Sequence, residues 1–163
     1  MSGDFRDRSL RASLLDRLVA TGESDRGRYG RQSLSDLVRS VHEHLELLLN
    51  TRWRAAPFDD SLAEIRRSLV QYGIPDFAST SAASRSGREE FARRIRDAIL
   101  LHEPRFISDS VRVAILEVDD TSRSIEFRIE GTLHAKPYPL PVVFHSEVNP
   151  DDQRIRVRSS EHV

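Results

Sequence analysis

The 163-residue chain contains no cysteine, which excludes disulfide bonds, thiolate zinc sites and a cysteine nucleophile, and fits a reducing compartment. It also lacks any apolar run that approaches the roughly 18 residues of a membrane-spanning helix. Its first residues interleave acids with arginines, unlike a secretory signal. We therefore expect a cytoplasmic protein with no direct membrane insertion.

An excess of one charge is also missing, because 25 Lys and Arg residues face 26 Asp and Glu residues. Nucleic-acid-binding proteins normally carry a clear basic excess, so the balance argues against a nucleic acid partner. The seven glycines are scattered, with no phosphate-binding loop and no nucleophile elbow. The six histidines show no metal-ligand spacing. We expect neither a cofactor nor a metal.

Helical periodicity dominates the first two thirds of the sequence. The clearest helix begins after Ser33, a residue type that caps helix N-termini, and stops near Asn50. An earlier, shorter helix carries Leu14 and Leu18 on its apolar stripe, which either docks on a partner or packs on this chain's own helices. The four predicted helical segments are 9–20, 33–50, 61–73 and 86–104.

The apolar period changes from 3.6 to 2 after residue 110. Alternation is cleanest between Ser124 and Ala135, where Ile125, Phe127 and Ile129 share one face. The sequence predicts an α+β fold, with N-terminal helices packed on a C-terminal antiparallel sheet of about four strands. We divide the chain into an N-terminal helix and linker, partly flexible, at 1–32 and a single domain at 33–163. The predicted strands are 111–118, 124–135, 140–148 and 153–158.

Glu103, Pro104 and Arg105 lie at the joint between the helices and the strands. A residue before proline avoids the helical region, so Glu103 is expected to be extended. Residues two apart in extended chain point the same way, so Glu103 and Arg105 would project together beside a rigid ring. We expect both side chains to be held outward, where they would be available to a partner or to each other. The alternative is a helix-ending proline with an incidental surface ion pair.

Other candidate partner-binding residues lie apart from this joint. Trp53, the only tryptophan, follows Arg52 and either anchors a partner or caps the domain's own core. Arg154 and Arg156 line one face of the last strand, as a charged guard against promiscuous pairing at a sheet edge. Gly73 permits a left-handed turn at a helix exit that demands no chemistry.

Four motifs in order resemble the TssE family of type VI secretion baseplate subunits. That family is related to the baseplate wedge proteins of contractile-tailed phages and is sometimes labelled lysozyme-like. The resemblance covers about residues 10 to 160, although Ile74 stands where the family pattern has leucine. The motifs are SLLDRL at 13–18, LLNTR at 48–52, SLVQYGIPDF at 68–77 and EPR at 103–105.

The resemblance implies a structural protein rather than an enzyme. It would join TssF and TssG in the wedges of a six-fold baseplate at the inner face of the cell envelope. There it would help to initiate a sheath of TssB and TssC. It also implies that Glu103, Pro104 and Arg105 form a partner-binding loop. On this view Glu103→Ala abolishes assembly while the isolated protein still folds, and deleting 153–163 uncouples the sheath.

A muramidase that uses Glu103 as general acid is the main alternative function. It would need a second carboxylate in a cleft, for which Asp76 and Asp109 are the nearby candidates. The neighbouring Arg105 argues against it, because a cation lowers an acid's pKa. A generic α+β adaptor unrelated to secretion is a second alternative.

Overall fold

The computed structural model describes residues 33–53, 63–66, 68–75, 84–118, 124–148 and 154–159. The predicted helix at 9–20, with Leu14 and Leu18, lies outside these residues. Two long helices dominate the described part, α3 (Leu34–Asn50) and α5 (Arg85–His102). No helix among the described residues is long and apolar enough to cross a membrane.

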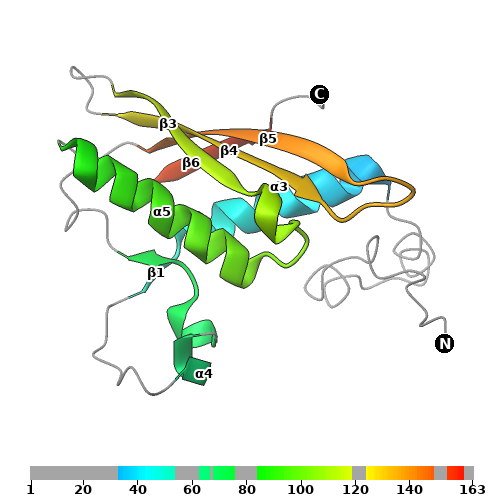
Figure 1. Cartoon of the computed structure of the whole chain (residues 1–163), viewed down its shortest axis with the longest axis horizontal. Helices are drawn as coiled ribbons and strands as arrows, with labels where there is room; N and C mark the ends of the chain where they lie inside the picture. The colour runs from blue at the N-terminus through cyan, green and yellow to red at the C-terminus, as the bar shows by residue number, and fades with distance from the viewer. Residues whose placement is uncertain are drawn as a thin grey trace.

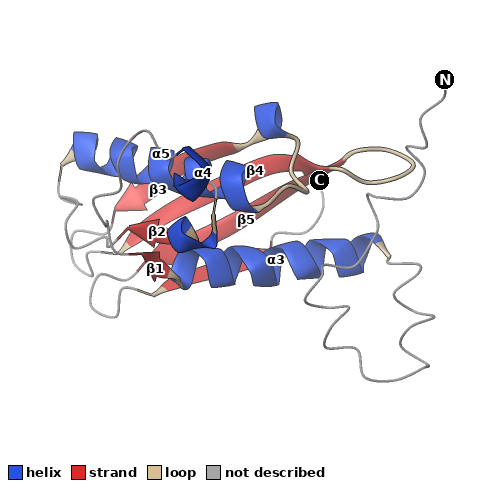
Figure 2. Cartoon of the chain, turned by 90° about the horizontal axis from the view of Figure 1, so that it is seen from below, coloured by secondary structure: helices blue, strands red, loops and turns tan. Residues whose placement is uncertain are grey.

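A four-stranded antiparallel sheet follows the helices in the order β3-β4-β5-β6. Both long helices lie on the same face of it, with α5 packed against β3 and α3 against β6 (Figures 1 and 2). The predicted α+β fold with four strands is therefore confirmed. The strands are β3 (Arg112–Val118), β4 (Ile125–Leu133), β5 (Leu140–Val148) and β6 (Ile155–Ser159).

The core forms where the helical stripes meet the inner face of the sheet. Ile125, Phe127 and Ile129 are all buried, as the alternation in β4 predicts. Phe91 of α5 meets Phe127 edge to face, with ring centroids 5.9 Å apart, a preferred aromatic geometry. Leu34 also falls on the apolar period of α3, but it does not join the core: it is the first residue of the helix and is 41% exposed.

Local side chains determine where the helices begin and end. Ser33 and Asp36 form a reciprocal capping box that starts α3. The predicted helix at 61–73 is wrong beyond α4 (Ala63–Arg66), since Leu69 lies in the 3₁₀ turn η1 (Leu69–Gln71) and is 83% exposed. Ser68 accounts for the interruption, because its hydroxyl accepts a hydrogen bond from the Val70 N–H and offers the backbone a non-helical alternative.

Two of the motifs meet in a small parallel sheet between β1 (Arg52–Trp53) and β2 (Ile74–Pro75). The Ile74 N–H donates to the Thr51 carbonyl at 3.0 Å. Gly73, just before this contact, has φ of +112°, and a Cβ there would lie 2.3 Å from the Thr51 oxygen. The left-handed turn predicted at Gly73 is confirmed, and only glycine fits it without strain.

Candidate protein interaction site

The Glu103–Arg105 loop turns its charges inward, so the predicted outward projection is wrong. Pro104 ends α5 and leaves Glu103 as the C-cap of that helix, with φ of −121°. The Glu103 side chain is 3% exposed and the Arg105 side chain 17%, while Pro104 is exposed. Arg105 Nε donates to Glu103 Oε1 at 2.6 Å and Nη2 to Oε2 at 2.5 Å. The two charges satisfy each other in a bidentate pair.

The same guanidinium reaches across to α3. Its Nη1 donates to Ser40 Oγ at 2.9 Å, and its Nη2 donates to the Ser40 carbonyl at 3.4 Å and to His44 Nδ1 at 3.0 Å. Sequence reasoning missed Ser40 and His44. Their signal was available, because both fall on the helical spacing of the buried stripe, and Ser40 is 5% exposed. We call Ser40, His44, Glu103 and Arg105 the Arg105 cluster.

Electrostatics keep Glu103 ionised. Burial by itself raises the pKa of Glu103, but the hydrogen bonds and the positive charge of Arg105 lower it below its ordinary value. Burial and the negative charge of Glu103 raise the pKa of nearby Tyr72. A general acid must hold a proton and reach a substrate, and the Glu103 carboxylate does neither. The geometry therefore argues against a muramidase that uses Glu103.

Backbone hydrogen bonds fasten the loop to the end of β4. The His134 N–H donates to the Arg105 carbonyl at 2.8 Å, and the Ile107 N–H donates to the Thr132 carbonyl at 2.8 Å. The Phe106 ring, 3% exposed, lies directly over Gly131, where a Cβ would come within 2.6 Å of it. The loop therefore joins α5, α3 and the sheet at one point.

The chain was compared with known protein families. The family described as baseplate wedge protein gp25 matches residues 35–138, more than half of the chain. The chain belongs to the baseplate wedge protein gp25 family. The gp25 family is a structural one that contributes to the baseplates of contractile tails. No curated protein and no solved structure matches the chain.

The gp25 match runs from α3 to the β4–β5 connection and contains the whole Arg105 cluster. It also contains Arg52, whose Nη1 donates to the Leu49 carbonyl at 2.5 Å and so caps the end of α3. The backbone of Trp53 lies in β1, but its side chain is not among those that the structure describes. Partner binding by Arg52 and Trp53 stays a prediction.

The remaining predicted residues lie beyond the gp25 match. Arg154 precedes β6 and Arg156 lies within it, and both are exposed. They are not brought together with the Arg105 cluster, because β6 is at one edge of the sheet. No group of three potential metal ligands occurs among the described residues.

Proposed function

We propose that this gp25-family protein is the TssE-type subunit of a type VI secretion baseplate, joining TssF and TssG and helping to initiate a TssB–TssC sheath. The observation that supports it is that the motifs resembling the TssE family contact one another or the same helices. LLNTR and YGIP pair as β1 and β2, and EPR locks α5 to α3 and β4. Such contacts between separate motifs hold the helices and the sheet in fixed positions, as a rigid assembly subunit requires.

In this proposal the charged residues of the loop act from inside the protein. Arg105 donates its hydrogen bonds to Glu103 and to Ser40 of α3, inside the protein. Pro104, between them, is exposed, and its ring presents a rigid surface whose ordering costs little on binding. A wedge partner would therefore touch Pro104, while the Arg105 cluster holds it in place. The N-terminal leucines Leu14 and Leu18 remain candidates for a second contact with TssF or TssG.

The sheath contact needs revision at the C-terminal edge. The side chain of Asn50 bonds both the N–H and the carbonyl of Ile155, at 2.9 and 2.8 Å, and His42 Nε2 lies 2.6 Å from the Val157 carbonyl. Those groups cannot also pair with an added strand. Within the described residues, β6 therefore offers a sheath subunit its exposed side chains, Arg154 and Arg156, rather than its backbone.

Co-purification tests the proposal. Tagged wild-type protein expressed in its host should capture TssF and TssG together. Pro104→Ala should weaken capture by about tenfold, the loss expected when one interface contact worth about 1.4 kcal/mol is removed. The melting temperature should fall by only a few degrees, because losing a proline that restricts the unfolded chain costs about 0.4–1 kcal/mol. Pro139→Ala, an exposed proline in the β4–β5 connection, is the matched control and should capture normally.

Two results would contradict the proposal. Failure of the wild type to capture either subunit would remove the secretion assignment and leave only membership of the gp25 family. Full capture by Pro104→Ala would move the contact away from this loop.

A further inference from the structure

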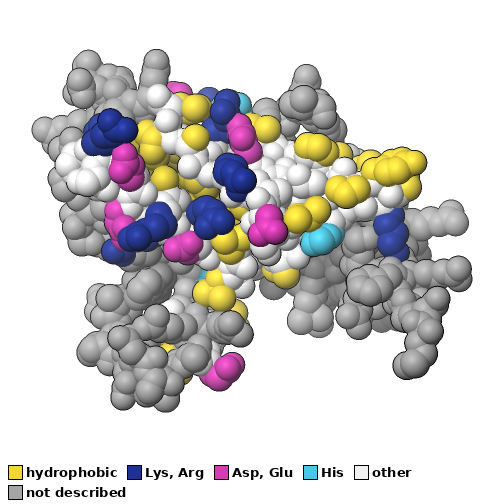
Figure 3. Space-filling model, in the orientation of Figure 1, with side chains coloured by type: hydrophobic (Ala, Val, Ile, Leu, Met, Phe, Trp, Pro, Cys, Tyr) yellow, Lys and Arg dark blue, Asp and Glu magenta, His cyan; other side chains and the backbone are white. Residues whose placement is uncertain are grey.

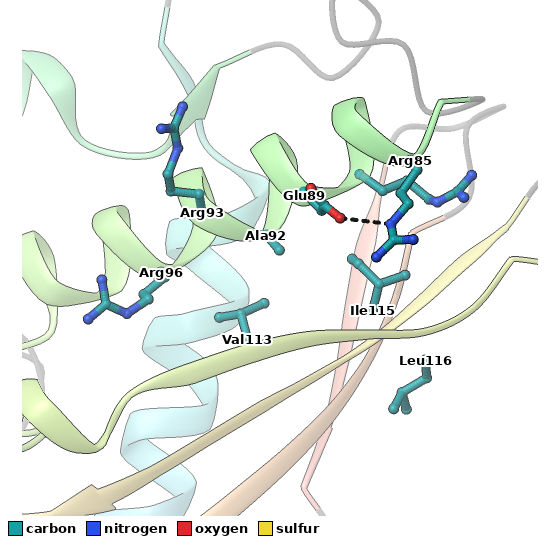
Figure 4. A pocket seen from close by; sticks show the side chains of 9 residues that line it. Arg85, Glu89, Ala92, Arg93, Arg96, Val113, Ile115 and Leu116 are labelled. Atoms are coloured by element: carbon teal, nitrogen blue, oxygen red, sulfur yellow. Dashed lines mark hydrogen bonds and ion pairs between the residues drawn. The ribbon is translucent and has the colours of Figure 1, made fainter.

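A hollow of about 600 Å³ lies between α5 and β3, away from the Arg105 cluster. Figure 4 shows α5 forming one wall and β3 the floor, with Val113 and Ile115 between them. This volume is in the range of sites that hold a ligand or several side chains. We call it the α5–β3 groove. It is lined by Arg85, Arg88, Glu89, Ala92, Arg93, Arg96, Val113, Ile115 and Leu116.

The groove runs along the other edge of the sheet. Among the described strands β3 pairs only with β4. Arg96 Nε donates to the Val111 carbonyl at 3.2 Å, so that carbonyl points out of the sheet toward α5. Alternate residues of a strand direct their backbone groups the same way, so those of Val113 and Ile115 also point outward. The Val111 carbonyl is occupied by Arg96 and Arg112. Within the described residues no side chain bonds the backbone of Val113 or Ile115, whereas Asn50 and His42 bond that of Ile155 and Val157 in β6.

The walls of the groove are cationic and its floor is apolar. Four arginines and the carboxylate of Glu89 line it, and just outside the lining Arg93 pairs with Glu90 and Arg96 lies 3.8 Å from Asp97. Glu89 pairs with Arg85 at 3.0 Å, with side chains 66% and 89% exposed, and such exposed pairs exchange partners at little cost. Figure 3 shows this face of the molecule, where Lys and Arg side chains alternate with Asp and Glu side chains beside apolar ones.

We propose that the α5–β3 groove binds an extended acidic segment of a partner protein. Its carboxylates pair with Arg85 and Arg88, its alternate apolar side chains cover Val113 and Ile115, and its backbone pairs with β3. The register of β3 with β4 shifts between Ile115 and Glu117, and such a bulge turns the edge away. The paired stretch therefore ends at Ile115. This inference goes beyond the proposed function, because it holds whichever machine the protein joins.

A peptide is favoured over a nucleic acid by two observations. The whole chain has a formal net charge of −1, whereas nucleic-acid binders usually carry a basic excess. The apolar floor would gain nothing from a phosphate backbone, whereas it would bury the aliphatic side chains of a peptide, which is favourable in water.

Fluorescence anisotropy with a labelled peptide of alternating Glu and Val tests the inference on the full-length protein. One comparison peptide alternates Lys with Val, and the other alternates Glu with Ser. We expect the Glu–Val peptide to bind about tenfold tighter than either, because the arginines repel the Lys–Val peptide and the Glu–Ser peptide has no apolar side chains to cover Val113 and Ile115.

Charge reversals on α5 locate the site. Arg85→Glu alone, and Arg85→Glu with Arg88→Glu, should weaken binding by about tenfold or more. Arg85 is so exposed that its reversal leaves the fold intact, which the melting temperature verifies. Arg94→Glu, the same charge change on the same helix but outside the groove lining, is the matched control and should leave affinity within about twofold.

Several outcomes would overturn the inference. They are no binding of the Glu–Val peptide at about 1 mM, equal binding of the Lys–Val peptide, and equal weakening by Arg94→Glu. Tighter binding of a single-stranded oligonucleotide of equal charge would assign the groove to nucleic acid instead. Peptide binding by a protein that fails to capture TssF and TssG would leave this inference standing without the proposed function.

Discussion

At the scale of single residues, Glu103 stabilises the fold through a buried ion pair and does not itself contact a partner. An exposed ion pair contributes little to stability, whereas a buried pair loses a great deal when one member is removed. The Glu103–Arg105 pair is buried, and Arg105 donates hydrogen bonds to both carboxylate oxygens of Glu103 and to Ser40. A substitution at Glu103 should therefore be read first as a change in stability.

Glu103→Ala should lower the free energy of unfolding by about 3–5 kcal/mol, because it leaves the Arg105 charge buried and unpaired. The isolated variant, expected from the sequence still to fold, would then fold with reduced stability. Urea denaturation measures the loss, and replacing both residues by methionine should restore most of it. Glu89→Ala, which breaks an exposed pair, is the control and should leave the midpoint unchanged. Wild-type stability in Glu103→Ala would show that the pair does not support the fold.

The pKa of Glu103 predicts a dependence of stability on pH. Because its pKa in the folded protein lies below the ordinary value of 4.5, its contribution is complete above pH 4.5 and is lost as the pH falls through the lowered pKa. Urea unfolding from about pH 7 to about pH 3 should show a steeper loss for the wild type than for Glu103→Gln. Asp36 and Glu90, whose pKa values are also lowered, contribute equally to both proteins. Parallel curves would contradict the prediction.

At the scale of elements, the joint between α5 and the sheet depends on Gly131. Its missing Cβ makes room for the Phe106 ring, which a methyl group would approach within 2.6 Å. Gly131→Ala should lower the free energy of unfolding by about 1–3 kcal/mol through overpacking, as measured in urea. Phe106→Leu in the same chain should recover part of the loss. Gly87→Ala, in the first turn of α5, is the control and should be neutral or stabilising.

The sequence predicts the long elements well because their signals are local. Ser33 and the stripe from Leu37 to Leu49 specify α3, and the alternation from Ile125 to Leu133 specifies β4. The Arg105 cluster could not be predicted in the same way. Arg105 meets Ser40 across 65 residues of chain, and no local pattern says that an extended loop will fold back onto a helix. The direction of Glu103 was therefore wrong, although Pro104 ends α5 as expected.

At the scale of the whole molecule, the two edges of the sheet differ in what they offer. β6 has backbone groups occupied by side chains of α3, whereas the backbone of β3 faces a groove. A strand edge with outward backbone groups favours pairing, and an occupied edge resists it. The two edges are therefore not equivalent: a partner strand can form backbone hydrogen bonds with β3 but not in the same way with β6.

The C-terminal edge gives the last prediction about the proposed sheath contact. Deleting 153–163 cannot test it, because Ile155 and Val157 are 0% and 6% exposed and their loss would open the core. Arg154→Glu with Arg156→Glu changes only exposed side chains. If these arginines meet the sheath, the number of fluorescent TssB foci in the host should fall by about tenfold, because reversing charges in a contact adds repulsion as well as removing attraction. TssF and TssG should still co-purify. Arg39→Glu, an exposed reversal on α3, should leave the foci unchanged, and normal foci in the double variant would exclude this edge from sheath initiation.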